Sequence, residues 1–470
     1  MDDRLHTIPN ERCYWLLHGT NLMETIKNKR YFIDLFSGCG GLSLGLMKAG
    51  WHGLFAIEQS SDAFKTLRHN LIEEGKHNAN MPRFDWPLWL EVRPYEIKDF
   101  LGSYGKRLKS LQGNIQLVAG GPPCQGFSFA GRRTGKDSRN ELFQYHLQVV
   151  ELVRPEFVLM ENVQGIDTAF RISKQEKKAR GRPRKSYAKR IRDALENQGY
   201  EVQQHILRAA DFGVPQLRPR YFALGIRRDL IGGRHPPDLL KVLLERREAF
   251  LRTRGLPTDR PVTVFEAISD LSISGKSLVE CKDKESPAGF VQINYKGPET
   301  SYQKLMHENM KGKQLNSLRL PRHRPETIKR FEKILKECRK GVQVSAEERA
   351  RLGIRKIAIT PLAPNRPSHT LTTLPDDLLH YAEPRIHTVR EHARLQSFPD
   401  WFEFCGKYTT GGDRRSKECP RYTQVGNAVP PLLAEIIGEA LHAILDELEI
   451  SLRYRKAGSQ WRRDKKTRKG

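Results

Sequence analysis

The sequence predicts an α/β fold: a doubly wound sheet with helices on both faces, and a smaller irregular region inserted late in the chain. Two observations predict it. From residue 31 to about residue 229, short apolar runs of strand length alternate with helical patterns, which is typical of a parallel sheet with crossover helices. From about residue 230 to 385 this alternation stops, and Pro, Arg and loop-forming residues dominate. Ligands of such a sheet are expected at the carboxyl ends of its strands.

The expected elements follow one another in a regular order. Short apolar runs predict strands at residues 31–36, 54–57, 115–119, 157–160, 201–206 and 221–226. Apolar residues at helical spacing predict the connecting helices at residues 42–49, 61–70 and 140–152. In the irregular region one helix is expected, at residues 325–340. Helical spacing returns at residues 388–396 and 432–448, so the chain is expected to close on its first domain.

These patterns divide the chain into five parts. A short N-terminal extension (1–30) precedes a first domain (31–229) that contains a basic insertion (171–192). The irregular region (230–385) follows. A return segment (386–450) leads back to the first domain, and a basic tail (451–470) ends the chain.

Positive charge is in excess: 81 basic against 55 acidic residues give a net charge of +26. Most of the excess lies in the basic insertion and the basic tail. Such a balance predicts attraction to polyanions, although solvated surface is the alternative for each run. Arg180–Arg184 reads Arg-Gly-Arg-Pro-Arg and resembles an AT-hook, in which an Arg-Gly-Arg core lies in the minor groove of A·T-rich DNA. A solvated loop is the alternative.

Several classes of protein are disfavoured. No uncharged apolar run approaches the roughly 18 residues of a membrane span, and the start of the chain lacks the order of a signal peptide. The seven cysteines are odd in number and show no C-x-x-C spacing, which argues against a disulfide framework or a zinc site. We therefore expect a cytoplasmic, nucleoid-associated protein with no membrane segment and no metal site.

A glycine-rich turn after the first strand is the first candidate site. Gly38, Gly40 and Gly41 would let a ligand approach the backbone closely. The turn is not the G-x-G-x-x-G of nicotinamide or flavin sites, because position 43 is Ser. Glu58 ends the second strand, where an acid can accept hydrogen bonds from both hydroxyls of a ribose. Such a turn followed by such an acid is also how S-adenosylmethionine sites are built.

The second candidate site indicates a more specific chemistry than the first. Cys124 follows two prolines at a strand end, so it is expected to be held rigidly toward the cleft. A buried structural cysteine is the alternative, but such a cysteine rarely lies in a loop dense in Gly and Pro. Glu161 ends the next strand, and Arg218 and Arg220 precede another. An acid, a thiol and two guanidinium groups on one edge suit an electron-poor ring with N–H and C=O groups.

Six blocks, in order along the chain, resemble those of the cytosine-C5 DNA methyltransferases. They are DLFSGCGG (34–41), GGPPCQGFS (120–128), ENV (161–163), QLRPR (216–220), REHARLQSFP (390–399) and QVGNAVPP (424–431). The resemblance implies a Rossmann-like methyltransferase sheet that binds S-adenosylmethionine. It also implies that the irregular region is the target-recognition region of the family, which reads bases in the major groove.

The resemblance also implies roles for the catalytic residues. Cys124 would add to C6 of cytosine, because C5 is too weak a nucleophile to take a methyl group unaided. Glu161 would hydrogen-bond N3 and the exocyclic amine. Arg220, together with Arg218, would hold O2 and offset developing charge. The target cytosine must leave the helix for this chemistry, so base flipping is implied.

Cofactor and DNA contacts are implied in the same way. Phe36 would pack on the adenine and Glu58 would bind the ribose, while the glycine turn would take the methionine end. Where the family usually has Asp-Ile this chain has Glu96-Ile97, so Glu96 is the expected contact of the adenine amino group and Asp99 competes with it. Pro123 and Asn427 complete the expected cofactor contacts. The expected DNA contacts are Ser128, Arg132, Arg133, Arg139 and Gln216.

The resulting hypothesis is a sequence-specific DNA (cytosine-5)-methyltransferase acting on double-stranded DNA. We expect a monomer of the microbial modification type, paired functionally with a restriction endonuclease. Two alternatives stay open. One is the tRNA-methylating branch of the family, which the intact Gly126-Phe127-Ser128 disfavours. The other is a catalytically silent DNA-binding protein on the same scaffold, which the complete set of chemical residues disfavours.

Overall fold

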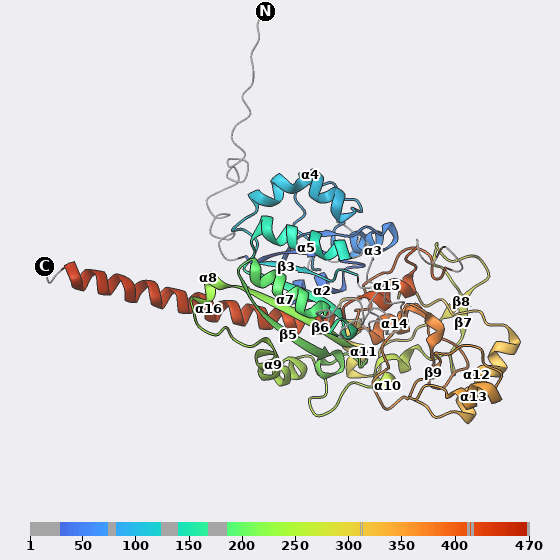
Figure 1. Cartoon of the computed structure of the whole chain (residues 1–470). Helices are drawn as coiled ribbons and strands as arrows, with labels where there is room; N and C mark the ends of the chain where they lie inside the picture. Colours follow the sequence, from blue (N-terminus) through green and yellow to red (C-terminus); the bar gives the residue numbers. More distant parts are fainter. Residues whose placement is uncertain are drawn as a thin grey trace, which may run out of the picture.

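A six-stranded sheet forms the centre of the protein (Figure 1). The computed structural model describes residues 29–73, 81–123, 140–167, 186–310, 312, 314–410, 414 and 418–467. The strand order is β2-β1-β3-β4-β6-β5. The strands are β1 (Tyr31–Leu35), β2 (His52–Ile57), β3 (Leu117–Gly120), β4 (Phe157–Val163), β5 (Tyr200–Arg208) and β6 (Pro219–Arg227). All six predicted strands are therefore present.

The directions of the strands refine the prediction of a parallel sheet. β1, β2, β3 and β4 pair in parallel, as predicted. β6 is antiparallel to both of its neighbours, β4 and β5. The loop that connects β5 to β6 contains one 3-10 helix (Ala209–Phe212) and no crossover helix, so it returns the chain in the opposite direction. The sheet is therefore mixed, and the fold class, α/β, is confirmed.

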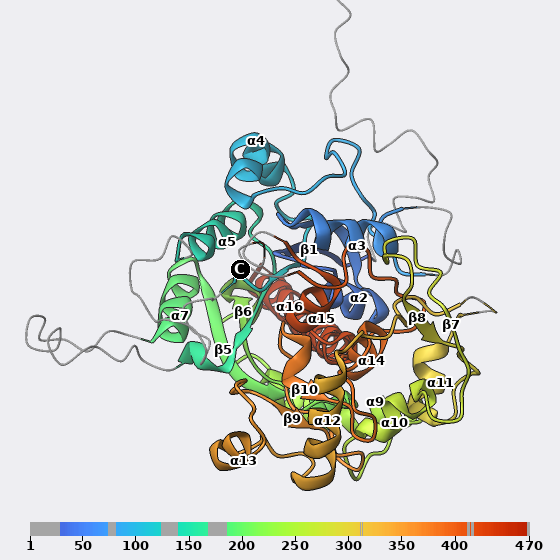
Figure 2. The same ribbon diagram turned by 90° about the vertical axis from the view of Figure 1, so that its right-hand side faces the viewer.

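Both faces of the sheet are covered by helices, as a doubly wound fold requires. One apolar cluster joins one face to α2 (Gly41–Lys48), α3 (Ser61–Leu71), α9 (Leu239–Thr253) and the long α16 (Pro431–Thr467). A second cluster joins the other face to α4 (Ile97–Ser110), α5 (Asn140–Val153) and α7 (Tyr187–Asn197). We call the sheet with these helices the sheet domain. Figure 2 shows α4, α5 and α7 together on one outer side.

The irregular region contains more helix than the sequence predicted. The expected helix at residues 325–340 is present as α12 (Pro325–Glu337), but several short elements surround it (Figure 1). α9 also belongs to this part of the chain, yet it packs on α16 in the sheet domain. The other elements are α10 (Val264–Ile268), β7 (Leu278–Glu280), β8 (Val291–Ile293), α11 (Ser301–His307), α13 (Ala346–Arg351), β9 (Thr360–Pro361) and β10 (Leu378–Leu379).

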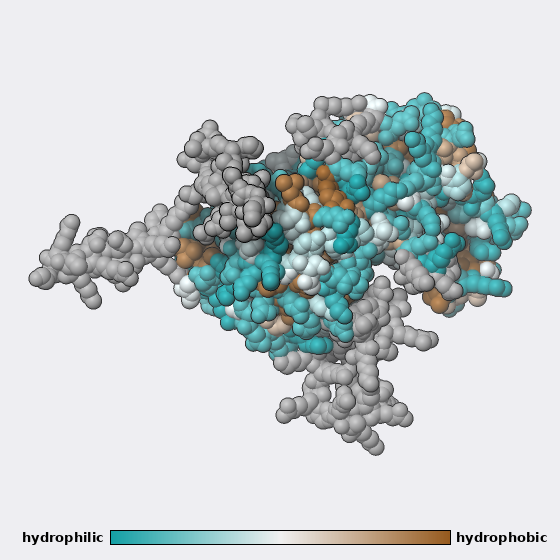
Figure 3. Space-filling view, turned by 90° about the horizontal axis from the view of Figure 1, so that it is seen from above, coloured by the Kyte–Doolittle hydropathy of each residue, from teal (hydrophilic) through white to brown (hydrophobic). Residues whose placement is uncertain are grey.

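The return segment brings three helices back to the sheet domain. They are α14 (Val389–Leu395), α15 (Arg421–Asn427) and α16. By length and composition alone the stretch Arg421–Leu452 could cross a membrane, but 78% of its apolar window is buried inside the protein. α16 packs there against α2 and α9, which is the position of a core helix. The face of the molecule in Figure 3 is mainly hydrophilic, with separate small apolar patches.

Candidate active site at the strand-end edge

The carboxyl ends of the parallel strands bring the predicted residues to one edge of the sheet. β1 leads into Phe36, β2 into Glu58, and β3 into the turn Gly121–Pro123, while Glu161 lies near the end of β4. Phe36 has a positive φ of 59°, which turns the chain sharply out of β1. The half-buried Phe36 ring lies nearly parallel to the ring of His146, with 6.4 Å between the centroids.

The three glycines of the first turn have different surroundings. A Cβ on Gly38 would meet no atom within 4 Å, so space lies beside this residue. A Cβ on Gly40 would come within 2.8 Å of the Leu71 side chain, and one on Gly41 within 2.4 Å of the Val429 carbonyl oxygen. Gly38 thus borders open space, whereas Gly40 and Gly41 allow α3 and the return segment to approach closely.

Glu58 is fixed by its own backbone surroundings. Its Oε2 accepts a hydrogen bond from the Gly38 N–H at 2.9 Å, and its Oε1 accepts one from the Ser60 N–H at 2.7 Å. Burial raises the pKa of the Glu58 carboxyl, and the N–H donors from Ser60 and Gly38 oppose that rise. The carboxylate is therefore held in one orientation next to the glycine turn.

The remaining predicted cofactor residues lie around this acid. Glu96 is exposed at the start of α4, and the adjacent Tyr95 N–H donates to the Glu58 carbonyl oxygen at 2.8 Å. Asn427 is exposed at the end of α15, and the residues after it touch Gly41. Space beside Gly38, an oriented carboxylate and a half-buried aromatic ring fit S-adenosylmethionine.

The acid and the guanidinium predicted for base recognition form an ion pair. Arg220 Nε lies 3.1 Å from Glu161 Oε1, and the two side chains are 11% and 13% exposed. Their strands place them together, because Glu161 on β4 lies beside the Arg220 end of antiparallel β6. Burial raises the pKa of the Glu161 carboxyl, and Arg220 opposes that rise. A carboxyl in this state can donate or accept a proton at a ring nitrogen.

The turn that leads to position 124 lies against this pair. A Cβ on Gly121 would be 3.0 Å from Glu161 Oε2. The Asn162 side chain, next to Glu161, donates to the Pro122 carbonyl oxygen at 3.0 Å and so fixes the turn before Pro123. Sequence reasoning assigned no role to Asn162, although the ENV block contained it. Cys124, Ser128, Arg132, Arg133, Arg139 and the AT-hook-like Arg180–Arg184 lie outside the described residues.

Arg218 has different partners from Arg220. Its side chain is fully buried, and its guanidinium donates to the carbonyl oxygens of Leu371, Gly426 and Ala428 at 2.8–3.3 Å. These carbonyls belong to the irregular region and the return segment, so Arg218 joins those parts of the chain to the end of β6. Its φ of 26° is a further local strain that this burial holds in place.

The prediction that Gln216 contacts DNA does not agree with its position. Gln216 is fully buried. Its amide nitrogen donates to the Leu395 carbonyl oxygen and to the Gln396 side chain, and its Oε1 accepts from the Leu371 N–H at 2.9 Å. Both amide hydrogens and the carbonyl oxygen are therefore engaged inside the protein. The side chain joins the irregular region to the return segment instead of facing a cleft.

Comparison with known proteins assigns the chain to a family. The model of the C-5 cytosine-specific DNA methylase family matches residues 31–443. The chain is 31% identical to the type II methyltransferase M.DdeI of Desulfomicrobium norvegicum, with 89% of this chain and 90% of that protein covered. It is also 31% identical to the type II methyltransferase M1.HphI of Haemophilus parahaemolyticus, with 87% and 86% covered.

A solved structure shares the fold. It is the crystal structure of an E. coli prophage-encoded protein described as a DNA modification methyltransferase. The similarity has a TM-score of 0.56 at 24% identity, and it covers 89% of this chain and all of that one.

Proposed function

The chain belongs to the C-5 cytosine-specific DNA methylase family, and from this premise we propose how its residues divide the work. The family makes the protein an S-adenosylmethionine-dependent DNA cytosine-5 methyltransferase of the type II modification kind. The single observation that carries the proposal is the 3.1 Å pair of Glu161 and Arg220 beside the turn before Cys124. That arrangement offers a pyrimidine ring an acid and a cation on one edge, and we propose Cys124 as the nucleophile beside them.

Cys124 acts as the nucleophile. Its thiolate forms a bond to C6 of the flipped cytosine, and the electrons of the C5–C6 double bond then make C5 nucleophilic. S-adenosylmethionine, when bound, supplies a methyl group on a positively charged sulfur. After C5 has gained the methyl group, its proton passes to water, the C–H electron pair re-forms the C5–C6 double bond, and the bond from C6 to the Cys124 sulfur breaks with its electrons returning to sulfur. The proton at N3 returns to Glu161. Cys124 is thereby regenerated.

Glu161 and Arg220 stabilise the cytosine ring while the thiolate adds to C6. Adding sulfur to C6 pushes electron density toward N3 and O2, so a proton at N3 and a cation at O2 both lower the barrier. The buried Glu161 carboxyl, with its raised pKa, suits the N3 contact. Arg220 keeps its positive charge and suits O2. For Arg218 we propose a positioning role, because its guanidinium already donates to three carbonyl groups.

The cofactor is held at the neighbouring turn. We assign the adenine to Phe36, with Glu96 at its amino group, and the ribose to Glu58. Gly38 leaves room for the methionine end, and Pro123 and Asn427 border the site. Gly40 and Gly41 contribute through the close packing that fixes the turn.

DNA is bound across the same edge. We assign the strand around the flipped base to Ser128, Arg132, Arg133 and Arg139, and the reading of the target sequence to the irregular region. The basic excess of the chain supports contacts with phosphates. We further propose a monomer that acts in the cytoplasm, at the nucleoid, and protects host DNA from a partner restriction endonuclease.

Methylation of defined nucleic acids tests the proposal. The protein is incubated with tritiated S-adenosylmethionine and either duplex DNA or tRNA, and the labelled base is identified by chromatography. We expect 5-methylcytosine in duplex DNA from the native chain and none from Cys124→Ser. A label in tRNA alone, or the same label from Cys124→Ser, would contradict the proposal. Bisulfite sequencing of DNA from cells that express the chain then reports the target sequence.

A further inference from the structure

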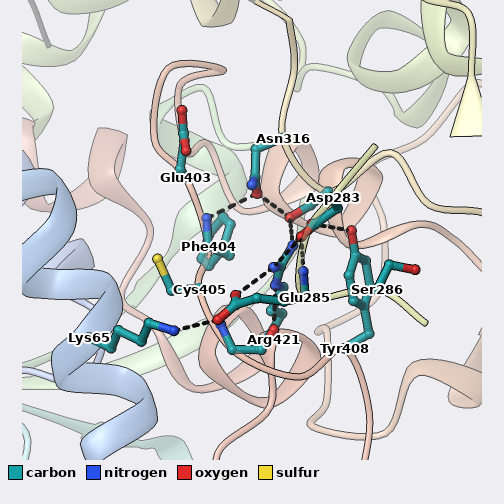
Figure 4. Close-up of polar contacts among 12 residues, drawn as sticks. Lys65, Asp283, Glu285, Ser286, Asn316, Glu403, Phe404, Cys405, Tyr408 and Arg421 are labelled. Atoms are coloured by element: carbon teal, nitrogen blue, oxygen red, sulfur yellow. Dashed lines mark hydrogen bonds and ion pairs between the residues drawn. The ribbon is translucent and has the colours of Figure 1, made fainter. Parts of the chain in front are cut away.

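A loop of the irregular region reaches onto α15, which ends at the proposed cofactor residue Asn427, and onto α3, which follows Glu58 in the chain (Figure 4). The loop joins β7 to β8 and includes Asp283 and Glu285. Arg421, the first residue of α15, donates through both terminal nitrogens to Asp283 and through Nη2 to Glu285 Oε2 at 2.9 Å. Lys65 on α3 forms an ion pair with the same Glu285. Two acids of the loop thus bind one cation from each helix.

This contact is a buried network of hydrogen bonds and ion pairs, because its central cation, Arg421, is buried. The Arg421 side chain is 1% exposed, and its Nε donates to the Gly406 carbonyl oxygen at 2.8 Å. Gly406 in turn donates its N–H to Glu285. Tyr408 donates its hydroxyl to Asp283 Oδ2 at 2.7 Å, and its ring lies 4.3 Å from the Arg421 guanidinium. A buried guanidinium needs such partners, because an unpaired one is costly.

Both helices lead directly to the proposed cofactor contacts. α15 begins at Arg421 and ends at Asn427. α3 follows Ser60, whose N–H is held by Glu58 Oε1 at 2.7 Å. Between the helices, the Gln424 side chain accepts from the Thr66 hydroxyl at 2.7 Å. A shift of either helix would therefore move Glu58 or Asn427 relative to the other.

We propose that Asp283 and Glu285 are positioning residues of the cofactor site, although they belong to the region that reads DNA. They hold α3 and α15 at the separation that lets Glu58 and Asn427 bind S-adenosylmethionine together. The inference rests on the proposed roles of those two residues. Since coupling between sites is reciprocal for binding, DNA contacts that stabilise this loop would strengthen cofactor binding, and bound cofactor would favour DNA.

The test uses substitutions that remove the charge of each acid and keep the shape of its side chain. Glu285→Gln and Asp283→Asn, alone and combined in the full chain, are titrated with S-adenosylmethionine by calorimetry without DNA. We expect the Kd for the cofactor to rise about tenfold in the double variant, a typical coupling between sites. The KM for the cofactor should rise in parallel, whereas kcat at saturating cofactor should stay unchanged. A purely structural role would lower the melting temperature without this split between KM and kcat.

A matched control lies in the same region. Glu337 on α12 forms an ion pair with Arg351 at 2.7 Å, and both side chains are partly exposed. Glu337→Gln makes the same change in charge away from α3 and α15, so the cofactor Kd should match that of the native chain. Lys65→Gln covers the case in which Asp283→Asn does not fold. Lys65 is 58% exposed, so its loss leaves Arg421 paired and should weaken cofactor binding in the same direction.

Two outcomes would overturn the inference. One is a folded double variant that binds S-adenosylmethionine as tightly as the native chain. The other is an equal loss of cofactor affinity in Glu337→Gln, which would trace the effect to net charge. If the native chain itself bound no cofactor, the proposed function would fail instead, so the two failures are distinguishable.

Discussion

The sheet domain and the joint behind it are both buried, but different forces hold them. We define the joint as residues 264–272 and 380–400, where the irregular region meets the return segment. The two clusters that pack the sheet domain consist of apolar side chains, and the first of them continues into the joint through residues such as Leu271 and Val389. The joint adds buried ion pairs to this packing. In the joint, Arg394 is fully buried and binds two buried acids, Asp270 and Asp400. A second buried cation, Arg385, binds Glu383 and Glu391 in the same way.

This difference predicts different responses to mutation. An apolar core loses stability in proportion to the volume removed, because its contacts are many and individually weak. A buried ion pair responds more abruptly, since removing one partner leaves the other charged and without solvent. The ion pairs of the joint also connect segments that lie far apart in the sequence. Because such pairs are directional, they fix one arrangement of the irregular region on the sheet domain.

The largest effect on stability is expected at Arg394. Arg394→Met keeps an unbranched apolar stem but leaves Asp270 and Asp400 without their cation, so the free energy of unfolding should fall by about 3–5 kcal/mol. Urea unfolding followed by tryptophan fluorescence measures the change. The control is Arg260→Gln, which removes a pair with Glu266 in which Arg260 is 51% exposed. It should lose less than about 1 kcal/mol. Equal losses of unfolding free energy in the two variants would contradict the expected difference between a buried and an exposed ion pair.

In the active site we expect the opposite balance, with a larger effect on activity than on stability. Glu161→Gln removes a proton donor but keeps the shape, so we expect kcat to fall about 10²–10⁴-fold. The loss of stability should be smaller than in Arg394→Met, because the Gln amide oxygen can still accept from Arg220, which also donates to the Pro219 carbonyl oxygen at 2.8 Å. Single-turnover methylation of duplex DNA and urea unfolding are measured on the same preparation. A variant that loses stability as Arg394→Met does, yet keeps its activity, would show that Glu161 belongs to the scaffold and not to the chemistry.

Mild acid should loosen the joint before the sheet domain. Burial lowers the pKa of His380 and His392 to about 4, and it holds the pKa of His387 well below its usual value. The unfolded chain binds these protons near pH 6.5. Their contribution is therefore complete above pH 6.5 and is lost as the pH falls toward 4. At pH 5.5 each histidine should remove about 1.4 kcal/mol.

Hydrogen exchange read by mass spectrometry, at pH 7.5 and pH 5.5 and corrected for intrinsic rates, checks this. Peptides from residues 380–395 should lose more protection at pH 5.5 than peptides from β3 and β4, because three fully buried histidines bind protons on unfolding of the joint and one does so in the described part of the sheet domain. Among the described residues of the sheet domain, His146 is the only fully buried histidine, with its pKa lowered to about 3. Equal loss of protection in both regions would contradict the contrast.

The smallest effect separates two neighbouring glycines. Gly38→Ala places a Cβ in open space at a φ of 57°, so it should lower the free energy of unfolding by only about 1–2 kcal/mol and weaken cofactor binding. Gly41→Ala would force a Cβ to within 2.4 Å of the Val429 carbonyl oxygen, so it should lower stability more. Thermal unfolding and calorimetric titration with S-adenosylmethionine measure both. A greater loss of stability in Gly38→Ala would reverse the assignment.

The sheet domain was predictable because both faces of most of its strands are buried, the edge strand β5 being the exception. Such strands appear as continuous apolar runs, so their order along the chain could be predicted. The direction of β6 could not, since the apolar pattern carries no direction. Glu58, Glu161 and Arg220 were found because each lies next to a strand end, where chain order and spatial position agree.

The joint and the loop between β7 and β8 were not predictable from apolar patterns. Asp283 and Glu285 are two acids in an irregular, polar stretch, and their partners Lys65 and Arg421 lie more than a hundred residues away. Gln216 was misassigned for the same reason. Arg218 and Arg220 follow it in the same short block of sequence, but its hydrogen-bond partners belong to residues 371, 395 and 396. Long-range polar contacts leave no period in the sequence.

The most direct test of the central claim is to trap Cys124 on its substrate. A duplex with 5-fluorocytosine at the target position cannot release the C5 substituent, so the bond between C6 and the thiol should persist. With S-adenosylmethionine present, we predict a complex that survives denaturing electrophoresis and maps by mass spectrometry to Cys124. Cys124→Ser should form none, and Cys338→Ser, which changes a free cysteine at the end of α12, should form it normally. No complex from the native chain, on a target established by bisulfite sequencing, would contradict the account.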